Sequence, residues 1–195
     1  RTKLTHRISN EGSGIPINPD WLMLQITEAL PSNTIIVNEG LTAARFLNDL
    51  WPYRERHDYH GLASGGIGWG MGAAVGVQLA HPRRPVCAII GDGSSMYSIQ
   101  ALWTAANHKL PLTYIIANNG GYRIIKQLLV AFHKNDNFIG MDFKNPEVDF
   151  TALAMSMGVE ARRVEDPLDL RDALESAFAN KKGPNLIEVM CDSSL

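Results

Sequence analysis

The sequence predicts a doubly wound α/β fold, in which a parallel sheet carries helices on both faces. Short apolar segments typical of strands alternate with segments of helical periodicity along most of the chain. Two expected strands, residues 85–90 and 112–117, are almost continuously apolar, as in parallel strands that are covered on both faces. Regular alternation of strands and helices indicates parallel pairing, because parallel strands need a crossover connection over one face of the sheet.

Length and composition restrict the class of protein. The chain has 195 residues, 45% hydrophobic and 19% charged, which suffices for one packed domain. Its 18 Lys and Arg against 20 Asp and Glu give a net charge of −2. Without a basic excess, neither nucleic acid nor an anionic membrane is an expected partner, and no apolar stretch reaches the ~20 residues of a membrane span. Two cysteines are too few for a disulfide framework and favour a cytoplasmic location.

The expected domain begins after a polar segment. Residues 1–18 are turn-rich and predict a linker or arm, which leaves residues 19–195 as the folded domain. Asn18 suits the N-cap of a first helix and Pro19 suits its first position. One face of this helix is apolar and consists of Leu22, Ile26, Ala29 and Leu30.

The remaining elements follow in order along the chain. Strands are predicted at residues 34–37, 85–90, 112–117 and 185–189, which are largely apolar, and also at residues 159–164. Helices are predicted from apolar spacing or capping residues at residues 42–50, 66–80, 99–106, 122–129, 150–157 and 167–178. Asp149 and Asp166 are expected to cap the last two helices.

Two turns at strand ends carry unusual chemistry. Gly91, Asp92 and Gly93 follow one buried strand, and Asn118 and Asn119 follow the next. The 27 positions between Asp92 and Asn119 match one strand–helix–strand unit of roughly 30 residues. Because parallel strands end at the same edge, we expect these two side chains to lie side by side, where open parallel sheets bind ligands.

Carboxylate, amide and carbonyl oxygens suit Mg²⁺, which often binds through few protein groups together with substrate phosphates. Gly91 and Gly93 let the backbone turn and let a phosphate approach, and Ser94 and Ser95 open a helix whose free N–H groups favour an anion. The sequence contains no GKS/T phosphate loop. Each motif alone is a common turn. Their occurrence one unit apart favours a site for a metal-bound diphosphate.

These motifs resemble the signature of thiamine-diphosphate-dependent enzymes, specifically of their diphosphate-binding domain. From about Ile35 to Val189 the chain is most similar to the benzoylformate decarboxylase group. The resemblance implies thiamine diphosphate and Mg²⁺ as cofactors, with the metal held by Asp92, Asn119 and the Gly121 carbonyl. The implied reaction is decarboxylation of a small 2-oxo acid, in which the cofactor stores the electrons.

The resemblance also assigns other residues around the cofactor. Gly65 would offer its carbonyl to the 4′-amino group, and Ile67 would separate the two rings. Ser94, Tyr97 and Thr42 would contact phosphate oxygens. The full implied set is Thr42, Gly65, Gly66, Ile67, Gly91, Asp92, Gly93, Ser94, Tyr97, Asn119 and Gly121.

Some positions depart from the benzoylformate decarboxylase pattern. Leu41 stands where that group has a hydroxyl residue, and Gly121 replaces a threonine. The residues expected to shape the substrate pocket differ in bulk from the pattern, and a helix core explains them equally well; they are Ile124, Ile125 and Leu128.

Part of the family's machinery has no counterpart here. The activating glutamate belongs to a separate pyrimidine-binding domain, and the catalytic histidines belong to that domain or the middle one. Glu39 ends a strand and is not assigned that role, whereas His57 and His60 are weak candidates for pocket neighbours. Because the sequence also starts without Met, we expect the C-terminal third of a larger enzyme. It would act as a homo-oligomer and be inactive without its other domains.

Several alternatives stay open. Residues 68–73 fit the dinucleotide pattern G-x-G-x-x-A, but the residues before them are polar where a strand is required. An acetolactate-synthase-like carboligase would share the same cofactor chemistry. A natural small subunit, as in split sulfopyruvate-decarboxylase-like enzymes, would receive its pyrimidine half from a partner chain. A non-catalytic scaffold is disfavoured because Asp92, Asn119 and Gly65 are intact.

Overall fold

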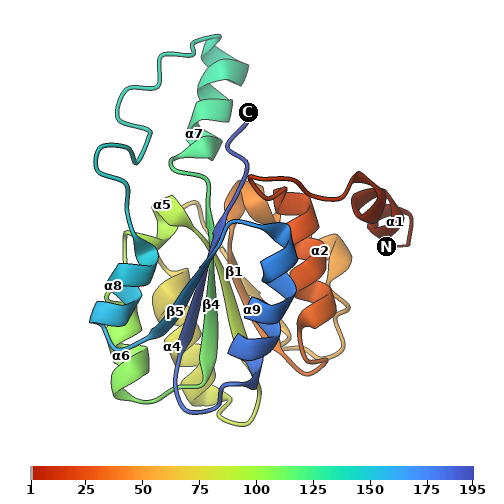
Figure 1. Ribbon diagram of the computed structural model, residues 1–195, viewed down its shortest axis with the longest axis vertical. Helices are drawn as coiled ribbons and strands as arrows, with labels where there is room; N and C mark the ends of the chain where they lie inside the picture. Colours follow the sequence, from red (N-terminus) through yellow and green to blue (C-terminus); the bar gives the residue numbers. More distant parts are fainter. Residues whose placement is uncertain (1) are drawn as a thin grey trace.

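A computed structural model describes residues 2–195 as one parallel sheet between two layers of helices (Figure 1). The six strands lie in the order β2-β1-β3-β4-β6-β5, and every pairing is parallel. Their bounds are β1 Ile35–Glu39, β2 Tyr59–Gly61, β3 Val86–Gly91, β4 Leu112–Asn118, β5 Glu160–Val164 and β6 Asn185–Met190. The predicted doubly wound α/β fold is confirmed.

Short helices connect the strands. Their bounds are α1 Thr2–Glu11, α2 Pro19–Ala29, the 3₁₀ turn η1 Leu41–Ala44, α3 Leu47–Leu50, α4 Gly70–Ala80, α5 Asp92–Ser95, α6 Ala101–Asn107, α7 Arg123–Leu128, the π turn η2 Leu129–His133, α8 Phe150–Ser156 and α9 Pro167–Ala179. Within residues 2–195, every helix is too short or too polar to cross a membrane.

Side chains alternate along each strand and build a core on both faces of the sheet. On β3, Cys87 and Ile89 pack with α2, α3 and α9, whereas Val86, Ala88 and Ile90 pack with α4, α6 and α8. Figure 1 shows these two helix layers on opposite sides of the strands. The near-continuous apolar sequence of β3 follows from burial on both faces.

The predicted caps are confirmed. Asn18 Oδ1 accepts a hydrogen bond from the Asp20 N–H at 2.8 Å, which satisfies a free donor at the start of α2. Asp149 Oδ1 accepts from the Ala152 N–H at 2.9 Å, and Asp166 Oδ1 does the same for α9. These caps set where the helices begin.

Four local features differ from the prediction. Residues 2–11 of the expected arm form the helix α1, which contacts α2 and buries Ile8. Residues 42–50 do not form one helix, because Phe46 leaves the helical region with φ −104° and ψ 3°. Residues 66–69 lie outside α4, since Gly68 takes φ +99°. The short edge strand β2 has partly buried residues and was not predicted.

The connections place a crevice between β1 and β3. The chain runs from β1 outward to β2 and then returns to the other side of β1 as β3. At such a reversal, the loops after the two strands turn away from each other and leave room for a ligand. Gly40 follows β1, and Asp92, the first residue of α5, directly follows β3.

Candidate functional site

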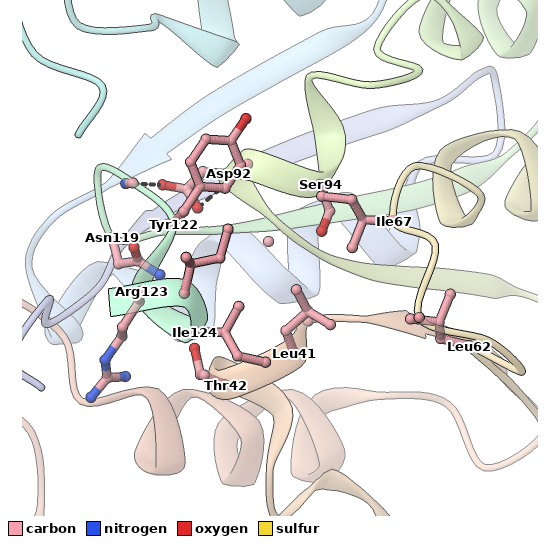
Figure 2. A pocket seen from close by; sticks show the side chains of 16 residues that line it. Leu41, Thr42, Leu62, Ile67, Asp92, Ser94, Asn119, Tyr122, Arg123 and Ile124 are labelled. Carbon is pink, nitrogen blue, oxygen red and sulfur yellow. Dashed lines mark hydrogen bonds between the residues drawn. The ribbon is translucent and has the colours of Figure 1, made fainter. Parts of the chain in front are cut away.

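A cavity of about 390 Å³ lies at the carboxyl ends of β1, β3 and β4 (Figure 2). Asp92, Asn119 and Ser94 contribute polar groups, and Leu41 and Ile124 contribute apolar ones. The complete lining is Gly40, Leu41, Thr42, Leu62, Gly65, Ile67, Gly91, Asp92, Gly93, Ser94, Asn119, Gly121, Tyr122, Arg123, Ile124 and Ile125.

Asp92 joins the two glycine-rich turns. The register of β3 and β4 pairs Gly91 with Ala117, so the turns that follow them are neighbours, as the sequence predicted. Asp92 Oδ1 accepts from the Gly93 N–H at 2.9 Å, and Oδ2 accepts from the Gly121 N–H at 3.0 Å. Each carboxylate oxygen has two lone pairs, so each can accept a further ligand.

Burial raises the pKa of Asp92 to about 6, against the opposing effect of backbone N–H groups, foremost that of Gly93. The side chain is 2% exposed, and among residues 2–195 no ion pair reaches it. A buried carboxylate without a cation is costly. A cation at this position would therefore be strongly favoured.

Ser94 presents a hydroxyl without a partner. The residue is 2% exposed, and its buried Oγ makes no hydrogen bond among the described residues. Figure 2 shows the side chain at the cavity. The neighbouring Ser95 differs, because its Oγ donates to the Asp92 carbonyl at 2.7 Å. Because Ser94 also lines the cavity, its free Oγ can form a hydrogen bond with a ligand bound there.

The turn after β4 is shaped by glycines. Gly120 takes φ +75°, a conformation that favours glycine, and its N–H donates to Asn118 Oδ1 at 2.9 Å. A Cβ on Gly121 would lie 2.3 Å from the Met141 carbonyl oxygen. At position 121 this close packing leaves no space for a side chain unless the backbone shifts.

The segment after β2 closes another side of the cavity. Leu62, Gly65 and Ile67 line it, whereas Gly66 does not. Beyond this segment, the buried Glu39 accepts hydrogen bonds from the N–H groups of Gly68 and Gly70. The dinucleotide alternative is disfavoured further, because residues 62–67 separate Gly68 from the end of β2.

Most of the predicted site residues meet at the cavity. Tyr97, Gly66 and Leu128 are the exceptions, and the side chains of Tyr97 and Leu128 are 59% and 48% exposed. Ile124 and Ile125 line the cavity at 37% and 42% exposure, which favours a pocket position over a helix core.

The two histidine candidates lie elsewhere. His57 and His60 stack with ring centroids 6.4 Å apart, and neither lines the cavity. His81 approaches the His57 ring at 5.9 Å and completes the group.

Several lining residues were not predicted. Leu62 follows β2, whose short sequence gave no strand signal, and Tyr122 continues the turn after β4. Among the described residues of the lining, Arg123 is the one cation, although its Nε donates to the Ser194 carbonyl at 2.7 Å and Figure 2 shows it pointing outward. The continuation of each turn into its helix is the signal that would have found Tyr122 and Arg123.

The donor set limits the metal chemistry. Within residues 2–195, no three His, Cys, Asp or Glu side chains converge to hold a metal ion. Asp92 and Asn119 instead bring oxygen-bearing side chains to the cavity, and oxygen is the donor type that suits Mg²⁺ when a ligand supplies further oxygens.

Comparison with known proteins agrees with this geometry. Residues 38–189 match the family described as "Thiamine pyrophosphate enzyme, C-terminal TPP binding domain", TPP being thiamine diphosphate. The benzoylformate decarboxylase of Pseudomonas aeruginosa is 39% identical over 90% of this chain and 33% of its own length. Acetolactate synthase 2 of Brassica napus is 32% identical over 98% of this chain and 30% of its own.

A solved structure supports the same relationship. The 4-hydroxybenzoylformate decarboxylase of Rhodococcus jostii, a thiamine-diphosphate-dependent enzyme, superimposes with a TM-score of 0.86 at 36% identity. The match covers 93% of this chain and 34% of that enzyme. The chain thus spans about a third of the length of these relatives. It belongs to the thiamine pyrophosphate enzymes and corresponds to their C-terminal TPP-binding domain.

Proposed function

We propose that this chain holds thiamine diphosphate through Mg²⁺, as part of a 2-oxo acid decarboxylase resembling benzoylformate decarboxylase. One observation carries the proposal. Asp92, a buried carboxylate without a cation, and Ser94, a buried hydroxyl without a partner, line the same cavity. A metal-bound diphosphate would satisfy both, because it brings a cation to Asp92 and acceptor oxygens to Ser94.

The proposed metal ligands are the Asp92 carboxylate, the Asn119 side-chain oxygen and the Gly121 carbonyl. Asp92 and Asn119 follow adjacent strands, and the Gly121 N–H already contacts Asp92. Ser94 and Thr42 would donate to phosphate oxygens, and Gly91 would leave room for them, whereas the Tyr122 ring fills the space where a Gly93 side chain would lie. Tyr97 remains a proposed phosphate contact, although it does not line the cavity.

The rings of the cofactor would lie against the segment after β2. Gly65 would accept from the amino group, Gly66 would leave space, and Ile67 would separate the two rings. When bound, thiamine diphosphate supplies a nucleophilic carbon and an electron sink for the loss of carbon dioxide from a 2-oxo acid. The chain's own contribution is to orient that group.

An apolar substrate side chain would suit the rest of the cavity. Leu41, Leu62, Ile124 and Ile125 present hydrocarbon there, and Leu128 is proposed to extend this surface. The activating glutamate and the catalytic histidines would come from the pyrimidine-binding and middle domains, in the same or a neighbouring subunit of a homo-oligomer. The two unpaired, buried cysteines favour a cytoplasmic location.

A carboligase of the acetolactate synthase type is the second candidate. The similarity to the Brassica napus enzyme over 98% of this chain favours it. A small subunit completed by a separate pyrimidine-binding chain is a third arrangement. The decarboxylase, the carboligase and the two-chain arrangement would all bind the cofactor in this cavity.

Calorimetric titration of thiamine diphosphate with and without Mg²⁺ tests the proposal. Asp92→Ala should abolish the Mg²⁺-dependent binding, because it removes the one anionic ligand. Asp169→Ala is the matched control, since it removes an exposed carboxylate from α9. The metal assignment would be refuted if the affinity for thiamine diphosphate did not depend on Mg²⁺, or if Asp92→Ala left that affinity unchanged.

A further inference from the structure

We propose that Glu39 is a positioning residue that fixes the segment carrying Gly65 and Ile67 against the cofactor. This inference depends on the proposed function of that segment. Glu39 does not line the cavity itself, so its effect is transmitted through the backbone at Gly68.

Glu39 is a buried anion held by backbone donors. It is the last residue of β1 and is 1% exposed. Oε1 accepts from the Gly68 N–H, and Oε2 accepts from the Gly70 N–H at 2.6 Å. Among residues 2–195, no ion pair involves Glu39. Its negative charge is therefore stabilised by this one stretch of backbone.

The carboxylate also caps the helix that follows. α4 has 11 residues and begins at Gly70, and Trp69 at its N-cap makes no side-chain capping bond. The first N–H groups of a helix lack partners and favour negative charge. Glu39 supplies both the acceptor and the charge from the neighbouring strand β1.

Two glycines make this approach possible. A Cβ on Gly70 would lie 2.7 Å from Glu39 Oε2 and 2.6 Å from Ile90 Cδ1. Gly68 takes φ +99°, and a Cβ there would lie 2.5 Å from Tyr97 Cβ. The backbone at both positions is therefore packed against its neighbours.

Gly68 is also held from its other side. Its carbonyl accepts a hydrogen bond from Ser98 Oγ at 2.5 Å. The N–H is thus fixed by β1 and the carbonyl by the turn after α5. With both its N–H and its carbonyl hydrogen-bonded, the Gly68 backbone is held in place and anchors the adjacent Ile67.

The segment before this anchor has little other support. Among the described residues, no hydrogen bond links residues 63–67 to the rest of the fold, and residues 63–66 are exposed. The preceding support is β2, which ends at Gly61. The Gly68 anchor therefore determines where Ile67 enters the cavity.

Glu39→Gln tests the inference in this chain, because it keeps the shape and replaces one acceptor oxygen by an NH₂ group that cannot accept. Hydrogen exchange at the Gly68 and Gly70 amides should accelerate roughly tenfold. With Mg²⁺ present, the Kd for thiamine diphosphate should rise about tenfold, equivalent to about 1.4 kcal/mol. The Kd for inorganic diphosphate should stay within about twofold, since that probe lacks the rings.

Asp58→Asn is the matched control. Asp58 is 3% exposed, and its Oδ2 accepts from the N–H groups of Arg54 and Glu55, each at 2.7 Å. It also pairs with Arg84 and does not line the cavity. Its substitution should reduce stability without changing the ratio of the two Kd values.

The inference would be overturned if Glu39→Gln left hydrogen exchange at the Gly68 and Gly70 amides unchanged. It would also be overturned if the Kd values for thiamine diphosphate and inorganic diphosphate rose by the same factor. The same ratio change in Asp58→Asn would also overturn it, because the effect would then be general destabilisation. If the unsubstituted chain bound neither ligand, the proposed function would fail, whereas hydrogen exchange would still report on the anchor. Should Glu39→Gln not fold, Glu39→Asp takes its place, since it keeps the charge but shortens the reach.

Discussion

Replacing Ser94 by alanine should lower cofactor affinity without lowering the stability of the free protein. The Ser94 hydroxyl is buried and unpaired, so the folded chain carries its desolvation cost, about 1–3 kcal/mol, without compensation. Removing the hydroxyl should leave the free energy of unfolding unchanged or raise it by up to about 1 kcal/mol. A hydrogen bond to a charged phosphate contributes about 1.5–3 kcal/mol, so the Kd should rise at least about tenfold.

Urea denaturation and calorimetric titration of thiamine diphosphate with Mg²⁺ measure the two effects. Ser95→Ala is the control, because Ser95 is equally buried but its Oγ donates to the Asp92 carbonyl. That substitution should cost about 1 kcal/mol of stability. If Ser94→Ala destabilised the free chain by as much as Ser95→Ala, or left the Kd unchanged, the hydroxyl would not be reserved for a ligand.

Two further predictions concern the packing and charge of the fold. Gly121→Ala should cost about 1–3 kcal/mol in urea denaturation, because its Cβ would lie 2.3 Å from the Met141 carbonyl oxygen and the backbone would have to shift. Burial, followed by the nearby His57 and His81, lowers the pKa of His60, so its neutral form is favoured on folding. Stability should therefore fall as the pH drops below the unfolded value of about 6.5, and His60→Gln should reduce that fall.

Matched substitutions isolate these effects. Gly183→Ala should be nearly neutral, since no atom lies within 4 Å of the added Cβ. His108→Gln changes an exposed histidine and should leave the pH dependence of unfolding intact. A Gly121→Ala variant as stable as the parent would contradict the close packing, and an unaltered pH profile in His60→Gln would exclude His60 as the source.

The sheet could be predicted because burial on both faces leaves a strong signal in sequence. β3 and β4 are apolar throughout, and the caps of α2, α8 and α9 are local side-chain chemistry. The helix α1 was missed because most of its residues are polar and only Ile8 is buried. β2 was missed because three partly buried residues at a sheet edge carry no periodicity.

The meeting of Asp92 and Asn119 at one cavity could also be predicted, because each follows a recognisable buried strand. The pairing register then brings them together. The hydrogen bonds of Glu39 could not be predicted, since its partners are backbone groups 29 and 31 positions away. The need for glycine at position 121 arises from residue 141, a contact that only the folded chain reveals.

The most direct test of the account is a crystal structure of this chain grown with thiamine diphosphate and Mn²⁺ in place of Mg²⁺, because anomalous scattering locates Mn²⁺. The account predicts one metal ion bound by oxygens of Asp92, Asn119 and Gly121, with diphosphate oxygens completing the shell. Ser94 Oγ should then lie within hydrogen-bond distance of a phosphate oxygen. A metal ion bound elsewhere, or a diphosphate that leaves Asp92 and Ser94 without contacts, would contradict it.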